Sequence, residues 1–68
     1  MANKQKEKLA KLCEHWANHN ESHKESFVKW RDIANEMQLI SVVEELNEAI
    51  KSMNKCSEHL LSVIDLIK

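Results

Sequence analysis

Three of the four histidines in this chain stand four residues apart, at His15, His19 and His23. Residues four apart on a helix lie one turn from each other, so the three imidazoles would form a stripe that drifts by about 40° at each step. Two imidazoles one turn apart can converge on one ion at about 2.0–2.1 Å, the arrangement used by helical zinc sites. The spacing therefore predicts a transition-metal site on this stretch.

Sulfur and a further imidazole are available elsewhere in the chain. Cys13 and Cys56 are its two cysteines, and His59 is its fourth histidine. A thiolate together with imidazoles suits nickel, zinc or copper better than magnesium or calcium. Free buried thiols are the plainer interpretation of the cysteines, and a disulfide is less expected in a long-helix chain without a secretory signal.

The elements that position these side chains are predicted to be long helices. The chain has no Gly and no Pro, so strong helix breakers are missing. Two apolar series alternate in steps of four and three, the pattern of a packed helix face. The first comprises Leu9, Cys13, Trp16, Asn20, His23, Phe27, Trp30, Ala34 and Met37, and the second Leu39, Val43, Leu46, Ile50, Met53, Ser57, Leu60, Ile64 and Ile67. This pattern places the rings of Trp16, Phe27 and Trp30 in the core.

A bend between the two series predicts an all-α antiparallel hairpin. Ser41 and Glu44 form an S-x-x-E capping box that can begin a second helix. We expect helices over about 3–37 and 41–67 in a single domain, 1–68. The alternative is a three-helix bundle with a break near 18–21, where Asn18 or Asn20 could cap, and helices near 3–18, 21–37 and 41–67.

The apolar face is too wide for one partner helix to cover. Positions beside the two series are also largely apolar: Leu12, Ile33, Val42, Ala49, Cys56 and Val63. Two hairpins meeting through this face would form a four-helix bundle. We therefore expect a homodimer, and a different protein docked on the same face is the alternative partner.

Antiparallel register predicts which residues of the two helices lie level. In a hairpin centred on the bend, facing residues have numbers that add to about 76. His23 then faces Met53, His19 lies beside Cys56, and His15 lies near His59. The predicted ligands are therefore His15, His19, His23, Cys56 and His59.

The same register pairs two polar residues in the seam. Asn20 and Ser57 lie level and could supply hydrogen bonds that hold the imidazole tautomers. In the simpler interpretation, Asn20, Ser57 and His23 form a polar layer that only sets the register, while His15 and His59 are solvated.

Charge and composition exclude several functional classes. Ten basic and eleven acidic residues give a formal charge of −1, and the two signs are interleaved, so nucleic acid and anionic membranes are unexpected partners. No apolar run approaches the roughly 20 residues of a membrane span, and we expect a cytoplasmic protein. No orienting group or oxyanion donor can be assigned beside Cys and His, so we expect no enzyme.

The stretch from His15 to Trp30 reads H-W-x-x-H-N-x-x-H-x-x-x-F-x-x-W. It resembles a small helical domain found as a C-terminal extension of some CooT-type nickel-binding proteins and as short stand-alone proteins. The resemblance implies a nickel or other metal context for His15, His19 and His23. It also implies a glycine before the last helix, where this chain has Gln38.

Together these observations predict a small helical protein that binds nickel, zinc or copper for storage, delivery or sensing. The competing prediction is a non-enzymatic structural or protein-interaction module, whose polar layer sets register and which needs no metal.

Overall fold

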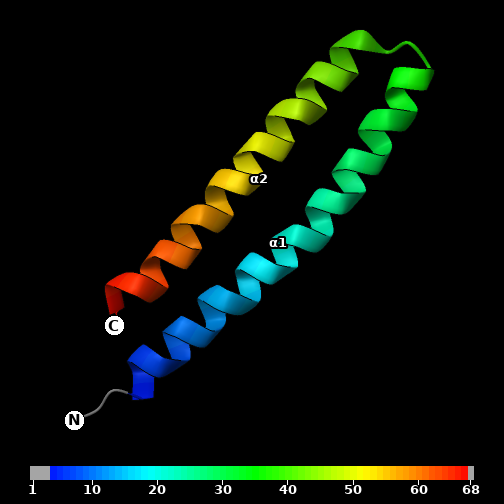
Figure 1. The fold of residues 1–68 in the computed structure, drawn as a ribbon. Coiled ribbons are helices and arrows are strands. Elements are labelled where there is room, and N and C mark those ends of the chain that lie inside the picture. Colours follow the sequence, from blue (N-terminus) through cyan, green and yellow to red (C-terminus); the bar gives the residue numbers. More distant parts are fainter. Residues whose placement is uncertain (1–3, 68) are drawn as a thin grey trace.

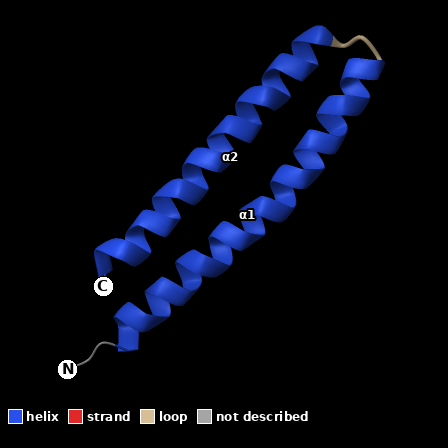
Figure 2. Ribbon diagram, in the orientation of Figure 1, coloured by secondary structure: helices blue, strands red, loops and turns tan. Residues whose placement is uncertain are grey.

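The computed structural model describes residues 4–67 and folds them into two antiparallel helices joined by a short turn (Figure 1). α1 spans Lys4–Glu36 and α2 spans Ile40–Ile67. Figure 2 shows that helix accounts for the described chain except the turn. The predicted all-α hairpin is confirmed. The predicted start of the first helix, at about residue 3, lies outside the described residues, and the other three boundaries are within one residue of those expected.

α1 is continuous over 33 residues. The three-helix alternative is therefore wrong, because residues 18–21 lie inside an uninterrupted helix. Asn20 does not cap a break; its side chain turns toward α2 and bonds there. A polar residue in a heptad series thus marks a contact between helices here.

The turn closes α1 with a Schellman motif. The Leu39 amide donates to the Ala34 carbonyl and the Gln38 amide to the Asn35 carbonyl, both at 3.0 Å. Gln38 has a φ of 63°, the left-handed conformation that favours glycine. The position at which the resemblance implied a glycine is therefore occupied by a glutamine in a glycine-like conformation.

α2 begins one residue earlier than predicted. The Val43 amide donates to the Leu39 carbonyl at 3.0 Å, so Leu39 caps the helix through its backbone. Ser41 lies inside the first turn, and the predicted start at a Ser41–Glu44 capping box is wrong. The chain leaves the Schellman turn already directed into α2, which leaves no separate segment for a side-chain cap.

The face of α1 that packs on α2 differs from the prediction at every second position. We call this face the inner seam. Trp16 and Trp30 are 44% and 56% exposed and His23 is also exposed, so placing them between the helices was wrong. The following residue in each case, Ala17, Lys24 or Arg31, is buried or half-buried instead. The inner seam comprises Cys13, Ala17, Asn20, Lys24, Phe27, Arg31 and Ala34.

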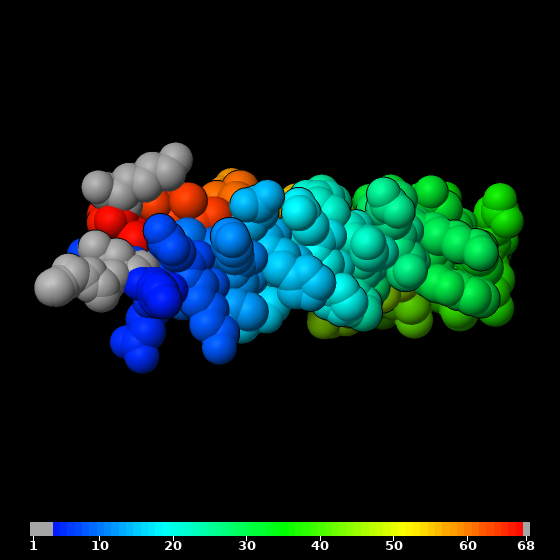
Figure 3. All heavy atoms as spheres, turned by 90° about the horizontal axis from the view of Figure 1, so that it is seen from below, coloured from blue at the N-terminus to red at the C-terminus, as the bar shows by residue number. Residues whose placement is uncertain are grey.

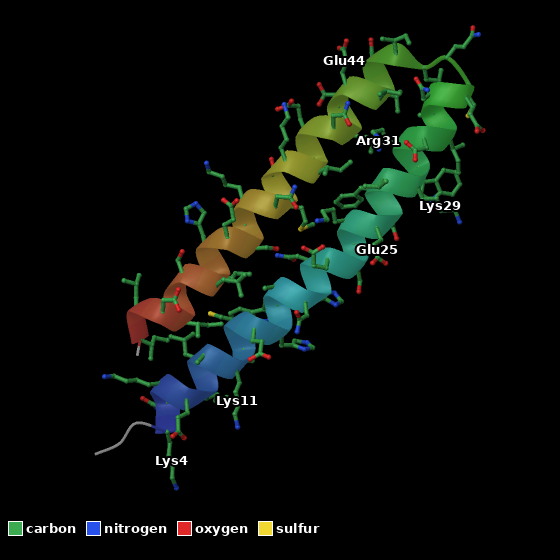
Figure 4. The ribbon with its side chains drawn as sticks, in the orientation of Figure 1. Lys4, Lys11, Glu25, Lys29, Arg31 and Glu44 are labelled. Carbon is green, nitrogen blue, oxygen red and sulfur yellow. The ribbon has the colours of Figure 1, made fainter. Side chains whose placement is uncertain are left out.

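Side-chain size explains the shift. Ala17 and Ala34 are each 5% exposed and let the two backbones approach closely, which an indole ring at the same place would prevent. Lys24 and Arg31 extend across the seam to polar partners on α2. Arg31 lies between the helices in Figure 4, whereas Lys11 and Lys29 point away from α2.

The series predicted for α2 is confirmed from Val43 to Ile67. Its members are half-buried, and Ser57 is buried at 8% exposure. Leu39, at the start of the series, lies in the turn and is 41% exposed.

The hairpin is a thin rod of 57 × 15 × 11 Å with very little interior. Within residues 4–67 the buried apolar residues are Cys13, Ala17 and Ala34, and no large side chain is fully buried. Figure 3 shows α1 along the length of one side of the rod. Neither helix is long and apolar enough to cross a membrane.

Candidate metal centre

Two of the three histidines spaced four residues apart on α1 lie in direct contact. His19 and His23 are exposed on α1, and their Nε2 atoms are 3.0 Å apart. Their ring centroids are 4.5 Å apart, with the ring planes nearly perpendicular. The contact follows from helix geometry, because side chains four residues apart lie over one another on one face.

His15 belongs to the same stripe but lies further round the helix. Its ring is nearly parallel to that of His19, with the centroids 6.2 Å apart. It lines an open depression with Lys11, Glu14 and Asn18, all from α1. The structure therefore joins His19 and His23 more closely than it joins His15 to either.

The Asn20–Ser57 part of the predicted polar layer is present and extends to a sulfur atom, whereas His23, its third predicted member, is exposed and contacts His19. Asn20 Nδ2 donates to Ser57 Oγ at 3.4 Å and is 3.5 Å from Cys56 Sγ. The numbers 20 and 57 add to 77, close to the predicted sum, so the register prediction is confirmed by a contact. Both cysteines are free thiols; Cys13 is buried and Cys56 is exposed.

The predicted ligands do not gather into one cluster in a single chain. Among residues 4–67, no group of three or more His, Cys, Asp or Glu side chains is placed to hold an ion. His59 is exposed on α2, and Cys56 contacts Asn20. A single chain thus supplies a convergent pair of imidazoles, His19 and His23, which is fewer than the three or four ligands of a protein metal site.

Two contacts that sequence reasoning missed hold the other edge of the inner seam. Lys24 Nζ donates to Asn54 Oδ1 at 3.0 Å, and Arg31 Nη1 donates to Asn47 Oδ1 at 3.1 Å. Lys24 Nζ also forms an ion pair with Glu21 Oε2 at 2.9 Å, and the Lys24 side chain is partly exposed. Lys24 and Arg31 are seven residues apart, as are Asn47 and Asn54. This matched spacing of seven residues on both helices is the sequence signal from which the two contacts could have been predicted.

The two long edges of the hairpin therefore differ in chemistry. The edge with Lys24, Arg31, Asn47 and Asn54 is polar and internally hydrogen-bonded. The opposite edge carries Trp16, His23 and Trp30, all exposed. The imidazole pair lies near the middle of this second, largely apolar edge.

One protein-family model matches most of the hairpin. Residues 9–67 match the family model described as a domain of unknown function, DUF8180. The chain belongs to the DUF8180 family. The matched part of this DUF8180 domain includes the turn, most of α1 and all of α2, and with them each predicted ligand.

No curated protein and no solved structure matches the chain. The description of the DUF8180 family assigns no ligand, so the resemblance to CooT-type extensions and the metal site both stay predictions.

Proposed function

We propose that this DUF8180 protein binds a divalent transition metal through His19 and His23. The observation that carries the proposal is the 3.0 Å separation of their Nε2 atoms on an exposed helix face. At metal–nitrogen distances of about 2.0–2.1 Å, nitrogens this far apart subtend about 91–97° at the ion. That angle fits adjacent ligands of a square-planar or octahedral ion, which favours nickel or copper over tetrahedral zinc.

Further ligands belong to the same proposal. His15 is the next imidazole of the stripe, and Cys56 and His59 are exposed at neighbouring levels of α2. Cys56 can bind a metal as a thiolate only while it is reduced, so we place the protein in a reducing compartment such as the cytoplasm. The role is metal storage, delivery or sensing, and not catalysis.

We further propose that two hairpins associate into a homodimeric four-helix bundle. The exposed apolar edge supports this, since Trp16 and Trp30 leave large ring surfaces in water. In a bundle each helix packs against two neighbours, and α1 has one neighbour within its own chain.

Thermal unfolding tests the metal proposal. Chelator-treated protein is melted by circular dichroism with and without stoichiometric nickel, copper or zinc. A ligand at 100 times its Kd stabilises the native state by about 2.7 kcal/mol, which for a chain this short raises Tm by about 10–20 °C. His19→Ala should lose this rise, while the control Ser52→Ala, which changes an exposed residue of α2 that is not a proposed ligand, should keep it. An equal rise in wild type and His19→Ala, or no rise with any metal, contradicts the proposal.

A second function is favoured by a different observation. The exposed Trp16 and Trp30 would suit a structural or protein-interaction module that binds another helix through the same edge. That module needs no metal, so chelator treatment should leave both its stability and its association unchanged.

A further inference from the structure

α1 carries a second heptad series beside the inner seam. We call it the outer seam. Most of its members directly precede a residue of the inner seam, so the outer seam is rotated from it by about 100° around the helix. This is close to the angle between the two neighbours of a helix in a four-helix bundle. The outer seam comprises Leu9, Leu12, Trp16, His19, His23, Ser26, Trp30, Ile33 and Met37.

The outer seam is largely open to solvent in the single chain. Leu9, Trp16, Trp30 and Met37 are between 41% and 62% exposed. The whole chain exposes 5480 Å², about 1,000 Å² more than a compact protein of its mass. A stable dimer buries about 800 Å² on each partner. The surplus is therefore sufficient for an interface with one further copy.

We propose that a second copy packs antiparallel on the outer seam, so that His19 and His23 of both copies form one metal site on the two-fold axis. This inference rests on the metal binding proposed above and names how the site is completed. One chain offers two convergent imidazoles. Two chains offer four, a full set for a square-planar ion.

Symmetry and side-chain size select the register of the two copies. In an antiparallel pair of heptad seams, facing residues have numbers with a constant sum, and the sum that brings histidines together is about 42. His19 then faces His23 of the second copy, and the two-fold axis repeats this contact. The same sum places Trp16 opposite the small Ser26, and Trp30 opposite Leu12.

A neighbouring allowed register is displaced by one heptad, with facing numbers that add to about 49. It would place His19 against Trp30 and His23 against Ser26. The imidazole of His19 would then be covered by an indole ring without a polar partner across the interface, which costs free energy. The register that pairs the histidines avoids this cost.

Charges beside the outer seam favour the antiparallel arrangement. Lys8 and Glu36 are exposed near opposite ends of α1, in the position that flanks the seam. In the proposed register, Lys8 of each copy lies beside Glu36 of the other. In a parallel pair this flanking position would instead lie beside the opposite flank of the partner's seam, and the attraction between Lys8 and Glu36 would be lost.

The α2 helix brings sulfur to the same level. Asn20 contacts Cys56, so Cys56 lies level with the midpoint of the His19–His23 pair and hence with the proposed axis. Val42, Ala49 and Val63 lie along the same edge of α2 and are small enough for a second hairpin to approach.

Metal stoichiometry and oligomeric state, measured together on the full chain, test the inference. Titration of chelator-treated protein with nickel or copper should reach one ion per two chains. Sedimentation equilibrium should give twice the 8.0 kDa mass of one chain, with dimerisation strengthened at least tenfold by the metal. His23→Ala should weaken metal binding more than tenfold.

The decisive variant lies away from the ligands. Trp30→Glu changes an exposed residue two turns from His23, so the hairpin should keep its helical circular dichroism. It should nevertheless become monomeric and lose metal affinity more than tenfold, because half of the ligands leave with the second copy. The matched control is Leu61→Glu, an equally exposed apolar residue on α2 outside the proposed interface, and it should change neither property.

Two results would overturn the inference, and they are distinguishable. One ion bound per monomer, unaffected by Trp30→Glu, would leave the proposed metal binding intact and remove the shared site. A dimer whose Tm and dimerisation constant do not change with any metal tested would contradict the proposed metal binding as well.

Discussion

Asn20 is the residue that links the two helices at the level of the candidate site. It donates to Ser57 Oγ at 3.4 Å and lies 3.5 Å from Cys56 Sγ. Ser57 is 8% exposed, so its hydroxyl needs a partner inside the protein. A polar pair within an otherwise apolar seam fixes which residues lie level, because any other register would leave both groups unpaired.

A double-mutant cycle between Asn20 and Ser57 measures this contact. Asn20→Ala, Ser57→Ala and the double variant should give a coupling free energy of about 0.5–1.5 kcal/mol in denaturant unfolding. A parallel cycle of Asn20→Ala with Ser52→Ala, which changes an exposed serine on α2, should give about zero. Equal coupling in both cycles would argue against the Asn20–Ser57 bond.

Gln38 holds a left-handed backbone conformation in the turn, with a φ of 63°. A residue with a Cβ is disfavoured in this conformation by about 1–2 kcal/mol. Glycine avoids that cost, but it loses more conformational entropy on folding, which offsets part of the gain. Gln38→Gly should therefore raise the free energy of unfolding by about 0.5–1 kcal/mol. Gln38→Ala, which keeps the Cβ, should stay within about 0.5 kcal/mol of wild type. A glycine variant less stable than the alanine variant would contradict this account of the turn.

The imidazole pair predicts a pH dependence of metal binding. A metal binds neutral imidazole, so protons and the metal compete for the same Nε2 atoms and metal affinity is lower at acidic pH. The metal-induced rise in Tm should be full at pH 7.5 and nearly absent at pH 5. The metal-free protein melted at the same pH values is the control. A rise that persists unchanged at pH 5 would mean that groups other than these histidines bind the ion.

At the scale of elements, α1 has two heptad faces and α2 contacts one of them. The inner seam uses alanine where the chains approach closely and long polar residues where they reach across. The outer seam carries the bulky rings. Which face is internal to the hairpin is therefore decided by volume and by hydrogen-bond partners, and not by hydrophobicity.

Ala17 provides the test of this assignment, because it is 5% exposed against α2. Ala17→Leu should lower the free energy of unfolding by about 1–3 kcal/mol, since added volume strains a packed contact. Glu25→Leu adds the same side chain on an exposed part of α1, which Figure 4 labels, and should change stability by less than about 0.5 kcal/mol. If Ala17→Leu is neutral in chemical denaturation, the two helices do not meet at the inner seam.

At the scale of the whole molecule, the hairpin is long and thin. Its radius of gyration is 15.9 Å, against about 11 Å for a compact chain of the same length. Two hairpins side by side would cover the edge that carries Trp16 and Trp30 and would give both helices a second neighbour. The dimer proposed above would therefore have a larger interior than the single hairpin.

Charge reversal tests the orientation of that dimer. Lys8→Glu and Glu36→Lys should each weaken dimerisation about three- to tenfold, because each change makes two repulsive contacts across the two-fold axis. The double variant should restore dimerisation to near the wild-type Kd, measured by sedimentation at low salt. If both single variants associate as wild type does, Lys8 and Glu36 do not meet in the dimer.

The sequence by itself determined the elements, their antiparallel order and their register. Heptad spacing and the lack of Gly and Pro imply long helices, and one possible bend near Gln38 implies a hairpin. The bend then fixes that Asn20 and Ser57 lie level, as their hydrogen bond confirms. The stripe of histidines was also readable, because spacing of four on a helix determines which imidazoles lie one turn apart.

Only the tertiary structure decided which face of α1 meets α2. The residues 13, 20, 27 and 34 belong to the predicted series and to the observed inner seam alike, so periodicity could not choose between Trp16 and Ala17, or between His23 and Lys24, as their companions. Ala17 lies in the inner seam because its small side chain lets the two backbones approach closely. Lys24 and Arg31 lie there because their side chains donate hydrogen bonds to Asn54 and Asn47 of α2. That choice left His19 and His23 together on the open side, because a helix that turns one face inward necessarily turns the adjacent residues outward by about 100°.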